Sequence, residues 1–245
     1  MIIKHPGISF ITISLIAFLS CQKEEPQVEI TNSVPYIELL DIGFVDDKSG
    51  LDILFFHINI KDKEGNFGLN NEDIQYPFNK RNFIVDKFDD LIYYGSSDTL
   101  PEYNLYDYVI LRDEFNRAIV DTVLAPINPY HTNIWVDFYI KENEIFREFD
   151  FKKEFNLPFG YDGRFPFIEP SHNNFNINEW HFSGPFEIKR RSDQEAEIIY
   201  KMPSSGWLVI FPIDTIQMHI QVLDRDLNIS NKIITESFTL PGLKE

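Results

Sequence analysis

Residues 52–61 read Asp52-Ile53-Leu54-Phe55-Phe56-His57-Ile58-Asn59-Ile60-Lys61, and this stretch decides the fold. From Leu54 to Ile60 every second side chain is apolar, while His57 and Asn59 between them are polar. A period of two, carried by branched and aromatic residues, is typical of a strand that buries one face. The sequence therefore predicts a β-strand here, within a sheet that covers a core.

The same alternation recurs over residues 134–141 and 216–223. Weaker strand patterns lie at 36–45, 83–85, 106–111, 118–124, 196–202, 207–211 and 232–240. A helical period is found only over 142–155, where Ile145 and Phe149 share a face. Many short strands separated by turn residues, with at most one or two short helices, favour an all-β antiparallel sandwich over a parallel α/β sheet.

Composition narrows the classes of partner. The chain has 22 basic and 39 acidic residues, and a net charge of −17 repels nucleic acid. The densest basic group, Lys189-Arg190-Arg191, is predicted to be a solvated turn. A chain with one cysteine cannot form an internal disulfide, so we expect its 23 phenylalanines to supply a packed core.

The N-terminus has the pattern of a bacterial lipoprotein signal. One cation, Lys4, precedes an apolar run over 8–18 that is too short to span a bilayer. Cys21 follows directly after the small residue Ser20, which predicts cleavage there and acylation of the cysteine. The alternative for Cys21 is a spare thiol beside an ordinary cleaved signal or a short anchor.

These observations divide the chain into three parts. We expect a signal peptide over 1–20, an acylated cysteine with a tether over 21–34, and a single β domain over 35–245. The less regular stretches near 76–130 and 142–195 are expected to be insertions that decorate the sandwich.

Three motifs carry a resemblance to a known group. Gln22, Lys23, Glu24 and Glu25 are similar to the signal that sends lipoproteins of the phylum Bacteroidota to the outer face of the outer membrane. The turns Asp62-Lys63-Glu64-Gly65-Asn66-Phe67-Gly68-Leu69 and Asp224-Arg225-Asp226-Leu227-Asn228-Ile229-Ser230-Asn231 resemble those of an uncharacterised family of such lipoproteins. The resemblance implies an immunoglobulin-like sandwich, lipid-anchored in the outer membrane and facing the exterior. It implies no activity.

The first turn has the residues of a possible metal loop. Asp62, Glu64 and Asn66 present oxygen atoms at alternate positions, and Asp73 falls at the twelfth position. Oxygen ligands with glycines for tight curvature fit Ca²⁺. The same residues also suit a turn in which side chains accept backbone N–H bonds, so both interpretations stay open. The second turn, residues 224–231, is predicted to be a structural corner.

Two short patterns imply modification. Asp98-Thr99-Leu100 and Asp121-Thr122-Val123 resemble the O-glycan acceptor sites of exported Bacteroidota proteins, which implies sugars on Thr99 and Thr122. A third copy, Asp214-Thr215-Ile216, begins a predicted strand. Ordinary strand starts are the alternative for all three.

The sequence has no catalytic motif of a serine hydrolase, a zinc protease, a phosphate-binding loop or a dinucleotide fold. The chain is therefore predicted to be non-enzymatic. Aromatic residues in irregular segments are the better indication of function, since they stack on sugars or anchor proteins; core packing is the alternative. They are Tyr93, Tyr94, Tyr103, Tyr106, Tyr108, Tyr130, Tyr161, Trp180 and Trp207.

We therefore expect a surface lipoprotein that binds a glycan or an envelope protein, or serves as an accessory subunit of the outer membrane. One alternative is a glycan-active hydrolase, in which two carboxylates would face each other across a cleft. The other is a purely structural envelope lipoprotein. No cofactor is expected apart from the calcium ion of the first turn.

Overall fold

Two antiparallel β-sheets pack face to face in the computed structural model, which describes residues 33–47, 50–96, 105–155, 160–168 and 178–244. The first sheet has the order β1 (Tyr36–Val45), β2 (Asp52–Lys61), β9 (Glu195–Ser204), β8 (Phe186–Ser192) and β7 (His181–Ser183). The second has the order β11 (Ile233–Ile234), β10 (Ile216–Val222), β5 (Ile134–Glu142) and β6 (Ile145–Phe149). A separate pair is formed by β3 (Tyr108–Arg112) and β4 (Ala118–Leu124).

The alternation in residues 52–61 places one face of β2 in the core. Leu54, Phe56, Ile58 and Ile60 are fully buried, and the residues between them are half-buried. They share one hydrophobic core with the alternate residues of β5 and β10 from the opposite sheet. The predicted all-β sandwich is confirmed, while its finer immunoglobulin-like topology stays a prediction.

Most of the weaker strand predictions are also confirmed. Those at 36–45, 118–124 and 196–202 correspond to β1, β4 and β9, and the one at 106–111 corresponds to β3 after a short 3₁₀-helix, η1 (Leu105–Asp107). Two more 3₁₀-helices, η2 (Pro129–His131) and η3 (Leu240–Gly242), lie before β5 and at the end of the chain.

Two strand predictions fail because backbone pairing there is not continuous. The strand at 83–85 is wrong: the Ile84 N–H donates to the Leu124 carbonyl at 3.1 Å and Val85 forms an isolated bridge with Leu91, but no regular ladder is built. The chain then turns at Asp86, whose carboxylate accepts the N–H groups of Phe88 and Asp90. The strand at 232–240 is confirmed only as far as β11. There Thr235 offers its hydroxyl oxygen to the Met218 N–H at 2.9 Å, so the regular ladder stops.

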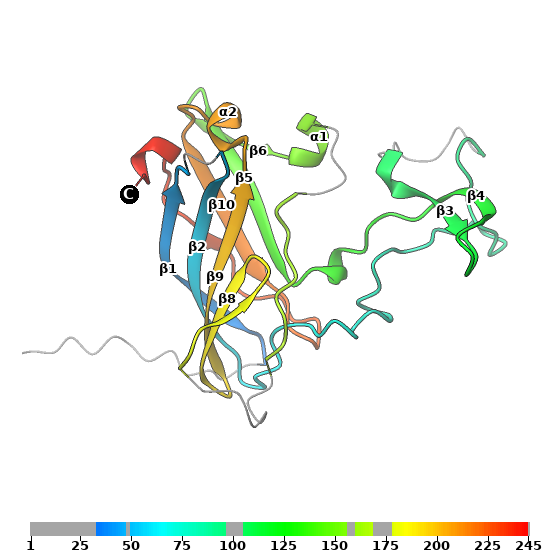
Figure 1. Ribbon diagram of the computed structural model, residues 1–245, viewed down its shortest axis with the longest axis horizontal. Helices are drawn as coiled ribbons and strands as arrows, with labels where there is room; N and C mark the ends of the chain where they lie inside the picture. Colours follow the sequence, from blue (N-terminus) through cyan, green and yellow to red (C-terminus); the bar gives the residue numbers. More distant parts are fainter. Residues whose placement is uncertain (1–32, 48–49, 97–104, 156–159, 169–177, 245) are drawn as a thin grey trace, which may run out of the picture.

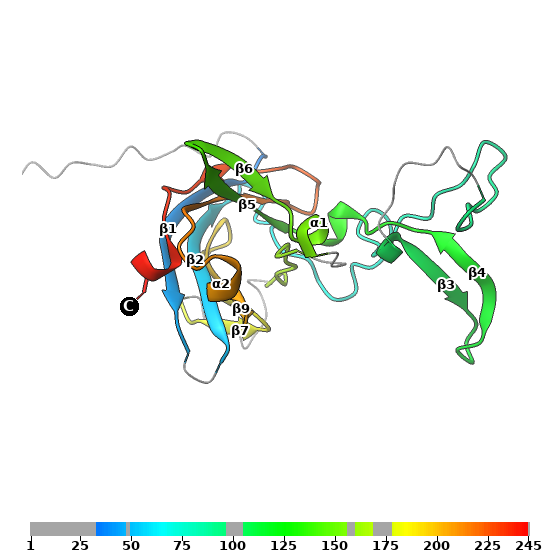
Figure 2. The same ribbon diagram turned by 90° about the horizontal axis from the view of Figure 1, so that it is seen from above.

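The apolar run 207–211 forms a helix, α2 (Trp207–Ile210), and not the predicted strand. A helical turn puts Trp207 and Phe211 on one buried face, and Trp207 Nε1 donates to the Met202 carbonyl at 2.7 Å. Periodicity does not separate helix from strand in so short a run. In Figure 2 α2 lies between the two layers, so it closes one end of the sandwich, which we call the aromatic end.

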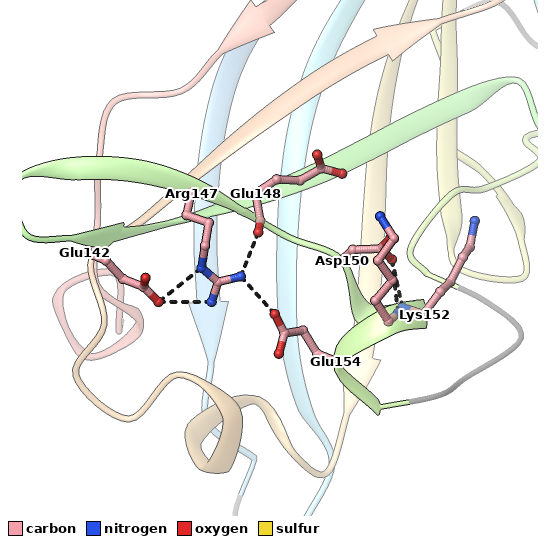
Figure 3. A network of polar contacts seen from close by, with 7 residues as sticks. Glu142, Arg147, Glu148, Asp150, Lys152 and Glu154 are labelled. Carbon is pink, nitrogen blue, oxygen red and sulfur yellow. Dashed lines mark hydrogen bonds and ion pairs between the residues drawn. The ribbon is translucent and has the colours of Figure 1, made fainter. Parts of the chain in front are cut away.

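The helix predicted over 142–155 is wrong in its first half. Asn143 and Glu144 both have positive φ, at 50° and 67°, and form the two-residue turn of the hairpin between β5 and β6. Only the second half is helical, as α1 (Phe151–Phe155). Arg147 of β6 joins the hairpin to α1 by pairing with one carboxylate from each (Figure 3).

The two expected insertions differ from each other. The described part of 76–130 leaves the sandwich, and β3 and β4 stand apart from both sheets in Figures 1 and 2. Residues 142–195 instead supply β6 to one sheet and β7 and β8 to the other. The predicted solvated turn at 189–191 is wrong, because these residues lie on β8 and Arg190 is 1% exposed.

Candidate functional site

Two loops that the sequence singles out meet at the end of the sandwich away from α2, which we call the loop end. Residues 62–69 follow β2 and residues 224–231 follow β10. The Arg225 N–H donates to the Asn66 carbonyl at 3.3 Å, and Asn66 Nδ2 donates to Asp226 Oδ2 at 2.7 Å. Side chains 160 positions apart in sequence thus form one surface.

A buried arginine supports the first loop. The Arg190 guanidinium lies 4.5 Å from the centre of the Phe67 ring, and its Nη2 donates to the carbonyls of Gly65 and Asp193 at 3.3 and 3.1 Å. Gly65 has a φ of +65°, and a Cβ there would lie 2.0 Å from the Asp193 oxygen, so glycine is required. Phe67, which stands where a calcium loop has glycine, is the packing partner of this arginine.

The Asp62 carboxylate fixes the shape of the loop. It is fully buried and accepts the N–H groups of Glu64 at 3.3 Å and Asn66 at 3.0 Å. Burial raises the pKa of Asp62 to about 6, against the lowering effect of these hydrogen bonds, and the charge of Asp224 raises it further. Burial also raises the pKa of Asp224. The loop end therefore contains two poorly solvated carboxyl groups.

The second loop is the predicted structural corner. Asp224 Oδ1 accepts the N–H groups of Asp226 at 2.9 Å and Asn228 at 2.7 Å. Asn231 binds both backbone groups of Ile37, accepting its N–H at 2.7 Å and donating to its carbonyl at 2.9 Å. These contacts attach the start of β1 to the opposite sheet.

A groove of about 790 Å³ lies beside the two loops. Its lining comes from residues 166–168, from β7, from Asn66 and Arg225 of the two loops, and from Asn70 and Glu72, which follow the first loop. Phe182 of β7 is 74% exposed. Aromatic rings combined with a few amide and charged groups are typical of a binding pocket, and the volume is in the usual range.

Two arginines hold the groove in shape. Arg225 Nη2 donates to Asp73 Oδ1 at 3.0 Å, and its guanidinium lies 5.2 Å from the centre of the Phe167 ring. Arg164 Nη2 donates to the carbonyls of Asn70 and Asp73 at 2.8 and 2.7 Å. Burial lowers the pKa of Arg164, and the neighbouring charge of Asp73 opposes this effect. The lining is therefore largely preformed.

The four predicted calcium ligands do not form one site. Both Asp62 oxygens accept backbone N–H groups, and Asp73 accepts a backbone N–H and pairs with Arg225. Glu64 is exposed, and the amide of Asn66 is bonded to an aspartate of the second loop. Among the described residues, no group of three or more His, Cys, Asp or Glu side chains could hold a metal ion. The hydrogen bonds of these residues are those of the turn interpretation, and calcium binding stays a prediction.

Most of the residues predicted to be modified or to act as an export signal lie outside the part of the chain that the structure describes. Outside the described ranges lie Cys21, Gln22, Lys23, Glu24, Glu25, Thr99 and Tyr103. Thr122 lies half-buried on β4, where its carbonyl accepts the Tyr94 N–H at 2.9 Å. Its glycosylation stays a prediction. No helix in the described part of the chain is long and apolar enough to cross a membrane.

The predicted aromatic residues differ in burial. Trp207 and Tyr161 stack at 4.7 Å between ring centres in the core, so packing is the correct interpretation for both. Tyr108 and Trp180 are half-buried. Four of the predicted residues are exposed, and all four belong to the region that leaves the sandwich: Tyr93, Tyr94, Tyr106 and Tyr130. The rings that line the groove, Phe167 and Phe182, are not among the predicted residues.

A second cavity bears on the hydrolase alternative. It measures about 50 Å³, and its carboxylate lining consists of Asp137, Glu148, Asp150 and Asp162. Burial raises the pKa of Asp162, as a general acid requires. However, Lys152 approaches Asp162 to 3.7 Å and Lys153 pairs with Asp150 at 3.1 Å. This volume has room for one or two water molecules and not for a sugar ring.

No protein-family model, curated protein or solved structure matches this chain. What the groove can bind is therefore inferred from its lining residues alone. Sequence reasoning reached Asn66 and Arg225 through the two turns, and it missed residues 166–168 and β7, which are remote from both turns in sequence. One signal was available: Gly184-Pro185 is a turn dipeptide, and it joins β7 to β8.

Proposed function

We propose that this chain is a non-enzymatic lipoprotein of the outer membrane, facing the exterior, which binds a partner through the groove at the loop end. The groove supports the binding role, because it combines about 790 Å³ with exposed aromatic and fixed polar groups. Cys21 supports the location, because a cysteine after a short apolar run is the acylation site of such proteins.

Filling the groove tests the binding role. Ser183→Trp puts an indole into the lining, and Ser96→Trp adds the same side chain to an exposed turn elsewhere. The full chain, purified in detergent, is presented to a glycan array and to solubilised cell-envelope proteins. We expect wild type and Ser96→Trp to capture a partner and Ser183→Trp to lose it.

Equal capture by the two variants would place binding outside the groove. A wild-type chain that captures nothing from either source would favour the purely structural alternative.

Fractionation tests the location. Cys21→Ser should move the chain from the membrane to the soluble fraction, because the acyl chains supply the anchor. Alanine at Lys23, Glu24 and Glu25 should leave it in the membrane and remove its accessibility to added protease. A Cys21→Ser chain that stays in the membrane contradicts the lipid anchor.

A further inference from the structure

The groove runs along the edge of β7 and not across its face. Three consecutive residues of β7, from His181 to Ser183, line it. Because neighbouring side chains of a strand point to opposite faces, a pocket on one face would be lined by alternate residues. Residues 166–168 also line the groove as a consecutive triplet. Two lengths of backbone therefore border the same space.

Among the described strands, β7 has a neighbour on one side only, and its other edge presents the backbone of Phe182. β7 is the last strand of its sheet. Gly184 and Pro185 join it to β8, and Ser183 pairs with Phe186 directly beside this two-residue turn. In such a hairpin the pair next to the turn exchanges hydrogen bonds and the following pair does not. Phe182 therefore directs its N–H and C=O away from β8 and toward the groove.

The other border also offers backbone groups. Within the described residues, no backbone hydrogen bond involves Phe167 or Ile168, and both residues are half-buried. Backbone N–H and C=O groups are obligatory hydrogen-bonding groups, and a row of them on a sheet edge is a template for another strand.

We propose that the groove binds an extended segment of a partner polypeptide, which adds to β7 as a further strand. This inference rests on the proposed function and names its partner. The backbone of Phe182 supplies the hydrogen bonds, and the rings of Phe167 and Phe182 contact an apolar side chain of the segment.

The charge of the groove indicates the composition of the segment. Glu72 lines the groove, whereas the charge of Arg225 is balanced by Asp73. The chain as a whole carries −17. A segment with lysine or arginine beside its apolar residues is therefore favoured over an acidic one.

A phage-displayed library of random heptapeptides, selected on the full chain in detergent, tests the proposal. We expect enrichment of alternating, branched and net basic sequences. Affinities of one enriched peptide are then measured for two variants. Phe182→Pro removes the outward N–H, a change that edge strands tolerate, and Phe182→Val keeps the N–H but loses the ring.

We expect Phe182→Pro to bind the peptide about tenfold more weakly than Phe182→Val, and the peptide to slow hydrogen exchange of the Phe182 amide in the wild type. Equal affinities, or an unprotected Phe182 amide in the complex, overturn the added strand. If Phe182→Pro fails to fold, the proposal is tested by the hydrogen exchange of the wild-type Phe182 amide with and without peptide.

The failure of the inference and that of the proposed function are distinguishable. If no peptide is enriched but Ser183→Trp still abolishes capture of a glycan, the groove is a binding site and strand addition is wrong. If Ser183→Trp affects no capture at all, the proposed function is wrong as well.

Discussion

The two ends of the sandwich are completed in opposite ways. At the aromatic end, rings pack against each other at 4.7 to 6.3 Å between centres; they belong to Phe138, Phe151, Tyr161, Trp207 and Phe211. At the loop end, a groove is lined by amide and charged side chains of the loops together with the rings of Phe167 and Phe182. The same two sheets are thus sealed by apolar surface at one end and kept open by hydrogen-bonded loops at the other. The aromatic end therefore contributes mainly to stability, and the loop end is where we propose that a partner binds.

The largest effect is expected from opening the aromatic end. Trp207→Ala removes a fully buried indole and should lower the free energy of unfolding by about 3–5 kcal/mol. Val209→Ala, on the exposed side of the same helix, should change it by less than about 0.5 kcal/mol. Urea unfolding of both variants measures the difference, and a Trp207→Ala loss no larger than that of Val209→Ala contradicts the sealing role.

A smaller loss is expected at the loop end. Asp62→Ala leaves the N–H groups of Glu64 and Asn66 without their acceptor, which should cost about 1–3 kcal/mol. Glu64→Ala removes an exposed carboxylate from the same loop, one that does not line the groove, and is the matched control. Because the first loop lines the groove, Asp62→Ala should also weaken peptide binding. Binding equal to that of the control would show that the loop does not shape the groove.

The sequence predicted the sheets better than either end. Leu54 to Ile60 alternate so regularly that only one face of β2 could enter a core, and the structure confirms it. The strand predicted at 207–211 was wrong because an apolar run of five residues fits a helix and a strand equally well. The prediction for Arg190 was wrong because its buried guanidinium is held by the Phe67 ring and the Gly65 carbonyl of a loop remote in sequence, in addition to the Asp193 carbonyl of its own turn. No local pattern contains that information.

The candidate site was predicted only in part for the same reason. Residues 62–69 and 224–231 were singled out by their turn chemistry, and the structure brings them together. Phe182 was not singled out, since its importance comes from the position of β7 at the edge of a sheet. Strand order is a property of the whole chain.

The stability of the loop end is expected to depend on pH through Asp62. The pKa of Asp62 is about 6 in the folded chain, against an ordinary value of 3.8. Between these values the folded chain binds more protons than the unfolded chain, so this group stabilises the fold as the pH is lowered from 7 toward 4. Relative to Asp62→Asn, the wild type should therefore gain stability at pH 5 compared with pH 7. Thermal midpoints of both chains measure this, and a constant difference contradicts it.

Arg147 should give the smallest effect. It pairs with Glu142 at 2.9 Å and Glu154 at 2.8 Å beside the aromatic end, and its hydrogen bond lowers the pKa of Glu142 (Figure 3). These groups are exposed, so Arg147→Ala should cost little, and the cost should shrink in 0.5 M salt. A large loss that does not respond to salt would mean that polar contacts also seal this end.

One hydrogen bond limits how far the groove can lie from the proposed lipid anchor. Asn228 Nδ2 donates to the Ser33 carbonyl at 3.2 Å, so the chain enters the sandwich at the loop end. Cys21 lies twelve residues before Ser33, a length that spans about 40 Å at most. With Cys21 held in lipid as proposed, the loop end would lie within about 40 Å of the membrane surface, where a partner in the same membrane can reach the groove. Because the anchor keeps the groove and such a partner at the same surface, a weakly bound added strand would then be sufficient for the interaction.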